Sequence, residues 1–145
     1  MIRTLHKLAS LAALGLIGSF FLSTVTVELF GSFEAVAVVK RSILYGIFLL
    51  VPLMATAGIT GNVLAKGKEG PLIREKKRRM PLIALNGMVV LIPAAYWLDT
   101  LASQGVFSRV FYSIQGIELF FGGLNIYWMT KNVLAGKKVA GSGKI

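Results

Sequence analysis

The chain has 145 residues; 55% are hydrophobic, only 15% are charged, and the mean hydropathy is +0.73. These proportions exclude an ordinary soluble domain, which needs more charge to cover its surface, and indicate a single domain with lipid as its main solvent. The net charge of +10 does not indicate nucleic-acid binding, because the excess lies in short segments that flank apolar runs. Cysteine is absent, which excludes disulfides, thiolate metal sites and a cysteine nucleophile.

Four apolar segments are long enough to cross a hydrocarbon core as helices, which takes roughly 20 residues each. In chain order they cover about residues 8–30, 42–65, 80–98 and 110–130. The predicted fold is therefore an all-α membrane protein, a four-transmembrane-helix antiparallel bundle over residues 1–135 with a flexible basic tail over 136–145. Pro52 and Pro93, inside the second and third spans, are expected to interrupt the helical hydrogen bonds there.

The first span has an alternative interpretation as a cleaved signal peptide, because Arg3 and Lys7 precede an apolar run. The run continues without a small-x-small cleavage pattern, which favours a retained span. Its small residues Gly15, Ser19 and Ser23 recur every fourth position and predict the face on which this helix contacts its neighbours.

The distribution of basic residues predicts the orientation. Two precede the first span, seven lie between the second and third, and four follow the fourth, whereas the other two connections hold only Lys40, Arg41 and Arg109. Because cytoplasmic loops carry the excess of lysine and arginine, both termini and the basic segment are predicted to be cytoplasmic.

The basic segment is the predicted contact with lipid headgroups. Its residues are Arg74, Lys76, Lys77, Arg78 and Arg79. Lying on anionic headgroups as an interfacial helix, each basic residue would contribute about 1 kcal/mol. The alternative is that the run only orients the protein and binds no particular lipid.

The fourth span has one polar face. Its members recur at steps of three or four residues: Gln115, Glu118, Gly122, Asn125 and Met129. Asn86 in the third span lies at a depth comparable to Asn125. One interpretation makes Glu118 a proton- or cation-handling carboxylate in a polar pocket. The other gives Asn86 and Asn125 an interhelical hydrogen bond and lets Glu118 meet water or pair with Arg109.

Four charged residues cluster around the first outer turn: Glu28, Glu34, Lys40 and Arg41. They are expected to form surface ion pairs that fix the first hairpin, each worth well under about 1 kcal/mol, with recognition of an external ligand as the alternative.

His6 is the only histidine, and its place before the first span predicts a solvated, interfacial side chain. It is also the candidate haem ligand of this sequence. The second axial ligand would then have to be Met80, Met88 or Met129, or a residue of a second subunit.

Three stretches carry a resemblance to known proteins: residues 39–46 (VKRSILYG), 78–87 (RRMPLIALNG) and 115–119 (QGIEL). Across most of its length the chain resembles small four-helix inner-membrane proteins of proteobacteria, which implies the fold and a bacterial inner membrane but no activity. Leu5-His6 at the entry to the first helix is also similar to the opening of membrane haem proteins such as the HemJ-type protoporphyrinogen oxidases and the copper-resistance membrane proteins.

Enzyme motifs are missing: there is no paired-carboxylate pattern, histidine-rich cluster, phosphate-binding glycine loop or nucleophile elbow. The first functional hypothesis is therefore a non-enzymatic bundle, an accessory or assembly subunit of a larger membrane complex or a homo-oligomer. The alternative is a haem- or quinone-binding redox protein. The third hypothesis is a small proton-coupled transporter or channel that uses Glu118, Asn86 and Asn125.

Overall fold

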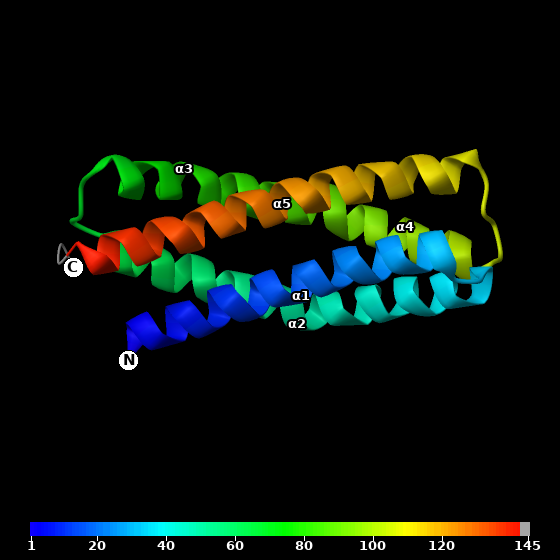
Figure 1. Cartoon of the computed structure of the whole chain (residues 1–145), viewed down its shortest axis with the longest axis horizontal. Coiled ribbons are helices and arrows are strands. Elements are labelled where there is room, and N and C mark those ends of the chain that lie inside the picture. Colours follow the sequence, from blue (N-terminus) through cyan, green and yellow to red (C-terminus); the bar gives the residue numbers. More distant parts are fainter. Residues whose placement is uncertain (143–145) are drawn as a thin grey trace.

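The structure, a computed structural model, describes residues 1–142 and is built from helices. In chain order these are α1 (Ile2–Phe30), α2 (Phe33–Ala65), α3 (Pro71–Asn86), η1 (Gly87–Leu91), α4 (Ile92–Ser103) and α5 (Arg109–Gly141). Since α3, η1 and α4 follow one another without a break, the described residues form four long rods that alternate in direction (Figure 1). The prediction of an all-α fold is confirmed.

Three helical segments within residues 1–142 are long and apolar enough to cross a membrane. They are Ile2–Phe30, Phe33–Ala65 and Pro71–Ser103. The fourth rod, α5, is as long as α2, at 33 residues. Its most apolar stretch is less hydrophobic than those of the other three, because Gln115, Glu118 and Asn125 lie within it. The three apolar segments support the assignment as a membrane protein.

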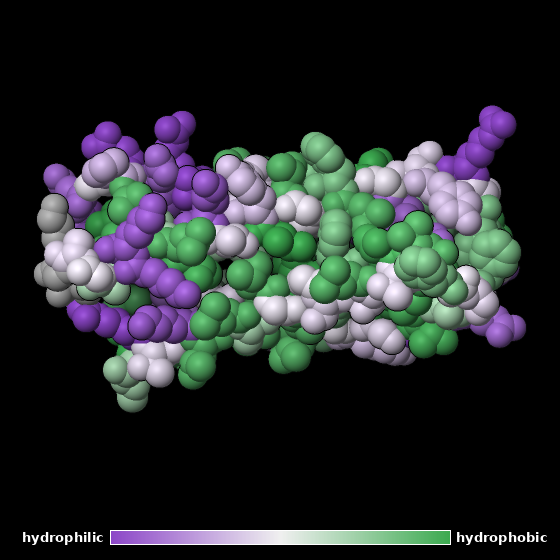
Figure 2. Space-filling view, viewed as in Figure 1, coloured by the Kyte–Doolittle hydropathy of each residue, from purple (hydrophilic) through white to green (hydrophobic). Residues whose placement is uncertain are grey.

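Hydrophilic side chains gather at one end of the molecule, and apolar ones surround its middle (Figure 2). The hydrophilic end holds both termini and the turn between α2 and α3 (Figure 1). We call it the basic end, formed by residues 1–7, 66–79 and 131–142. The opposite end holds the two turns that join α1 to α2 and α4 to α5.

Helices extend further than hydropathy predicts. Ser32 begins α2, because its side chain accepts a hydrogen bond from the Ala35 amide at 3.2 Å, and Glu34 in the first turn faces the positive helix terminus. Lys40 and Arg41, expected in an outer loop, consequently lie inside α2. At the other end of the chain, α5 continues through residues 136–141, part of the predicted flexible tail; residues 143–145 of that tail lie outside the described part.

A π-helical turn, η1, joins α3 to α4 and explains how the rod accommodates Pro93. The amide of Ile92 bonds to the Gly87 carbonyl, which spans five residues instead of four. Proline has no N–H and its ring crowds the carbonyl four residues earlier, so a wider turn just before it relieves both problems. Pro52, by contrast, lies inside α2 without ending that helix.

The rods pack as two layers, α1 beside α2 and α5 beside α3 and α4 (Figure 1). At the opposite end the layers are joined by a core of Val36, Leu98, Ala102 and Phe111. The rings of Phe33 and Phe107 also stack there, with centroids 4.4 Å apart. Across the bundle, the backbones of α1 and α3 stay apart, as do those of α2 and α5, so these pairs meet only through long side chains.

The predicted contact face of α1 is wrong. Gly15, Ser19 and Ser23 are exposed, whereas the buried positions are Ala9, Ala13, Ile17 and Thr24. Close packing against α2 is instead provided by Gly46, where a Cβ atom would collide with the ring of Phe20. The small residue that lets the two backbones approach therefore belongs to α2.

Candidate functional site: an internal cavity with a basic end

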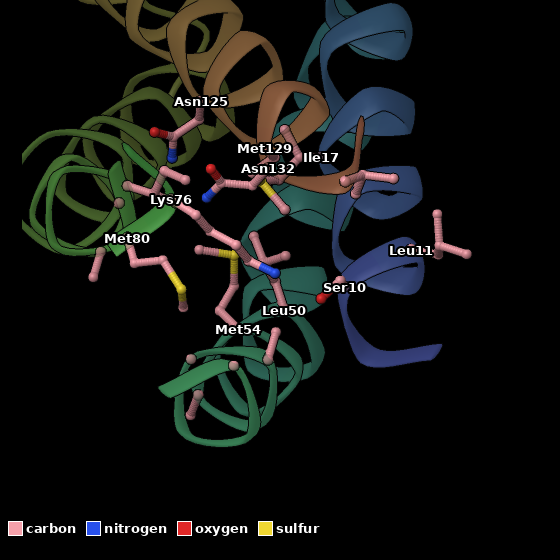
Figure 3. Close-up of a pocket in the computed structure, with 18 of the residues that line it drawn as sticks. Ser10, Leu11, Ile17, Leu50, Met54, Lys76, Met80, Asn125, Met129 and Asn132 are labelled. Carbon is pink, nitrogen blue, oxygen red and sulfur yellow. The ribbon is translucent and has the colours of Figure 1, made fainter. Parts of the chain in front are cut away.

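A cavity of about 970 Å³ lies between the two layers, lined by residues of α1, α2, α3, η1, α4 and α5. This volume is at the upper limit of the roughly 300–1,000 Å³ that is usual for ligand sites. Most of the lining is apolar, and four methionines contribute to it: Met88, and Met54, Met80 and Met129, which Figure 3 labels. Thioether side chains are flexible and adapt to irregular apolar ligands.

Charge is distributed unevenly along this lining. Five basic side chains and the histidine line the part at the basic end: Arg3, His6, Lys7, Lys68, Lys76 and Lys137. The one acidic residue of the lining, within residues 1–142, is Glu118, toward the opposite end. The cavity therefore combines an apolar interior with an entrance of positive potential.

His6 and Lys76 bridge the gap between α1 and α3. The Nδ1 atom of His6 lies 3.1 Å from the carbonyl oxygen of Ala57 and 3.1 Å from the Thr60 hydroxyl, and its Nε2 lies 3.1 Å from Nζ of Lys76. Because a carbonyl can only accept, Nδ1 carries the proton, and Nε2 accepts a hydrogen bond from the Lys76 ammonium.

This arrangement corrects the prediction of a solvated His6. The imidazole is partly buried, and Gly61 makes room for it, since a Cβ there would stand 3.0 Å from His6 Cε1. The ring occupies the same helical face as Ala9 and Ala13, both buried. As arranged, the Nε2 lone pair accepts from the Lys76 ammonium, so iron could bind this nitrogen only by displacing Lys76.

The predicted hydrogen bond between the third and fourth rods is confirmed. Nδ2 of Asn86 donates to Oδ1 of Asn125 at 2.7 Å and to the Phe121 carbonyl at 2.9 Å. The polar face of α5 is buried as expected and extends one step further, to Asn132. Sequence reasoning missed Asn132, although it continues the 125–129–132 spacing.

Four buried amide atoms have no hydrogen-bond partner among the described residues: Oδ1 of Asn86, Oε1 of Gln115, Nδ2 of Asn125 and Oδ1 of Asn132. Asn125 is fully buried, and Asn132 is 8% exposed. Both line the cavity together with Met129 (Figure 3). Buried amides normally find partners, so these atoms are incompletely compensated points in the packing between α3 and α5.

The cavity ends toward Thr24 and Glu118, and here the structure corrects two predictions. The partner of Glu118 is Lys40 of α2, not Arg109: Nζ donates to Oε2 at 2.6 Å. Gln115 donates to the same oxygen at 3.1 Å, and Lys40 also reaches the Thr24 hydroxyl at 3.4 Å. Lys40 was expected on the surface, yet its side chain is fully buried. The Glu118 carboxylate therefore joins α5 to α2.

Arg41 forms a second bond between the layers. Its Nε donates to Oδ1 of Asp99 at 2.7 Å, and its Nη2 donates to the Ser103 hydroxyl at 2.9 Å. The expected ion pairs of the first turn are thus replaced by pairs from α2 to α5 and α4. Glu28 and Glu34 take part in no ion pair within residues 1–142.

The predicted headgroup residues separate into two groups. Arg74, Lys77 and Arg78 are exposed, and Arg79 pairs with Glu75 one turn earlier at 2.7 Å. Lys76 alone of the five lines the cavity. Its helical face is the one that continues to Met80 and Ile83, because these follow at steps of four and three residues.

No protein-family model, curated protein or solved structure matches the chain. In residues 1–142 no group of three or more histidine, aspartate or glutamate side chains is placed to hold a metal ion. The cavity and its charge distribution are therefore the features that bear on function.

Proposed function

We propose that this chain is a four-span protein of the bacterial inner membrane that binds an amphiphilic molecule of the membrane between its two helical layers. Its action is non-enzymatic: it holds or presents the amphiphile, as an accessory subunit of a larger membrane complex or as a homo-oligomer. The observation that carries this proposal is the apolar cavity of about 970 Å³ with a basic entrance.

Three features support an amphiphile over a wholly apolar or a wholly polar ligand. The interior surface is mostly apolar, so burial of hydrocarbon against it is favourable relative to water. The entrance is basic, which suits a polar or anionic group. Asn125 and Asn132 line the cavity and add polar side chains to its otherwise apolar wall.

The orientation in this proposal places both termini and the basic end in the cytoplasm. Of the 16 basic residues, all but Lys40, Arg41 and Arg109 precede the first span, lie between the second and third, or follow the fourth. This excess supports the orientation through the positive-inside rule. For α5, the burial of its polar face against α1, α3 and α4 supports a fourth crossing, since the remaining surface is apolar.

Cysteine labelling tests this topology without background, because the chain contains no cysteine. In intact cells, a membrane-impermeant maleimide is expected to label Gln104→Cys and Ser32→Cys. Lys77→Cys is expected to react only after the membrane is permeabilised. Labelling of Lys77→Cys in intact cells would refute the orientation.

Native mass spectrometry of the protein released from mild detergent tests the binding. A retained molecule of lipid or quinone mass is expected, with about one copy per chain. Gly87→Phe should reduce its occupancy severalfold, since Gly87 lines the cavity and has open space beside it. Gly116→Phe is the matched control, because Gly116 also has open space but lies on the exposed face of α5. No retained molecule in the unmodified protein would contradict the proposal.

A further inference from the structure

We propose that the amphiphile carries an anionic headgroup, a phosphate or a carboxylate, and that Lys76 binds this group while the apolar chain extends toward Glu118. This inference rests on the proposed function and specifies its ligand. It also assigns His6 as a positioning residue for Lys76.

The setting of the Lys76 ammonium carries the first step. Lys76 is partly buried, with its Nζ 3.8 Å from where a Cβ of Gly136 would lie, so the ammonium stands between α3 and α5. Within residues 1–142, no carboxylate oxygen lies within ion-pair distance of it. A charge withdrawn from water is costly without a counter-charge. An anionic headgroup would provide one.

His6 positions the Lys76 ammonium. Its Nδ1–H donates to the Ala57 carbonyl, which fixes the ring on α2, and its Nε2 accepts from Lys76 at 3.1 Å. The ammonium has three donors, and the histidine takes only one. The other two remain available for headgroup oxygens. Neutral His6 thus holds Lys76 in place without neutralising it.

The surrounding charge favours an anion over a zwitterion. Arg3, Lys7, Lys68 and Lys137 line the same part of the cavity, and no acidic residue lines it there. A choline or ethanolamine group would meet only positive charge, whereas a phosphate or carboxylate would gain from every one of these side chains.

The length of the cavity fits a hydrocarbon chain. From Gly136, beside Lys76, to Glu118 a helix of this pitch covers about 27 Å, which is more than the roughly 15 Å that the chains of one leaflet cover and so leaves room for a full chain. Asn132 lies about 6 Å below Gly136 on this scale. That depth suits the ester or hydroxyl groups that link a headgroup to its chains, and the polar side chain of Asn132 lines the cavity there.

The experiment compares two lipids that share their acyl chains and differ only in headgroup charge. Purified full-length protein is equilibrated with an equimolar mixture of phosphatidylglycerol and phosphatidylcholine, and the retained lipid is counted by native mass spectrometry. The unmodified protein should favour phosphatidylglycerol. Lys76→Met should lower this preference about tenfold, the effect of losing one charged hydrogen bond. Lys76→Arg should keep most of it.

Lys77→Met is the matched control, because Lys77 is the neighbouring lysine on the same helix but is exposed. It should leave the preference unchanged. His6→Ala should lower the preference by less than Lys76→Met, and an unchanged preference would remove His6 from the proposal.

The outcomes distinguish the two proposals. Loss of headgroup preference in Lys76→Met with continued retention of lipid supports the inference. Retention of both lipids equally by the unmodified protein, or equal effects of Lys76→Met and Lys77→Met, overturns the inference and leaves the cavity as a binder of apolar chains. Retention of neither lipid overturns both.

Discussion

Replacing Glu118 by glutamine should destabilise the protein more than any other single loss of charge. The substitution keeps the shape and an acceptor oxygen but removes the counter-charge of Lys40, whose side chain is fully buried and whose Nζ lies 2.6 Å from the carboxylate. Removing one partner of a buried pair typically costs about 3–5 kcal/mol, because the remaining charge stays buried without compensation. With about 2–4 °C per kcal/mol for a chain near this size, the melting temperature should fall by at least about 6 °C.

Thermal unfolding in a single detergent, followed by circular dichroism, measures this loss. The matched control is Glu75→Gln, which removes a carboxylate from an equally short ion pair that is exposed, with 58% of the Glu75 side chain accessible. That pair is worth only about 0.5 kcal/mol. The double variant Lys40→Met, Glu118→Met removes both charges and should recover most of the stability, because apolar residues of similar size replace buried ion pairs with little loss.

Either of two results would refute an uncompensated Lys40 as the cause of the loss. If Glu118→Gln melts within about 2 °C of the unmodified protein, Lys40 is not desolvated and the pair is superficial. If the double variant melts as low as the single one, the loss reflects packing and not an uncompensated charge.

Three further variants probe other contacts by the same melting assay. Asp99→Asn should lower the melting temperature by less than half as much as Glu118→Gln, since its partner Arg41 is 48% exposed. The difference in melting temperature between Asp99→Asn and the unmodified protein should shrink at high salt. A loss as large as that of Glu118→Gln would contradict this. Asn125→Leu should cost only about 0.6 kcal/mol, or 1–2 °C, because interhelical amide bonds in membranes are weak and this substitution also removes an unsatisfied donor; a loss above about 5 °C would be too large for that bond. Ser32→Ala should cost about 1 kcal/mol by removing the cap of α2, with Ser113→Ala, whose exposed hydroxyl bonds only within its own helix, as the unaffected control.

Hydropathy and periodicity predicted the helical fold, the approximate position of each rod and the polar face of α5. They succeeded because an apolar stretch of this length satisfies its backbone hydrogen bonds in lipid as an α-helix. In a helix, residues at steps of three and four share a face. The hydrogen bond between Asn86 and Asn125 followed from comparing their depths.

Charged residues were the main source of error. A hydropathy window starts the second span only after Lys40 and Arg41, and so places both in a loop. The capping serine at position 32 and Glu34 indicate an earlier helix start. What sequence cannot supply is the distant partner: Glu118 lies 78 residues from Lys40. Only the packing of α2 against its neighbours shows that a buried lysine is compensated.

Lys76 and His6 were missed for a different reason. In a run of five basic residues every member appears equally exposed, and a histidine between Arg3 and Lys7 appears solvated. Their helical phase would have separated them, because Lys76 continues the face of Met80 and Ile83, and His6 that of Ala9 and Ala13.

The extra residue in η1 determines which helices the two halves of the third rod, α3 and α4, can contact. An α-helix turns about 100° per residue, so one additional residue rotates everything after Leu91 by that amount relative to an uninterrupted helix. Asn86, before the turn, faces α5, whereas Asp99, after it, faces Arg41 of α2. The spacing between these two residues is thus as much a part of the design as their identities. Deleting a single residue between them would keep Asn86 against α5 but would rotate the Asp99 carboxylate away from Arg41.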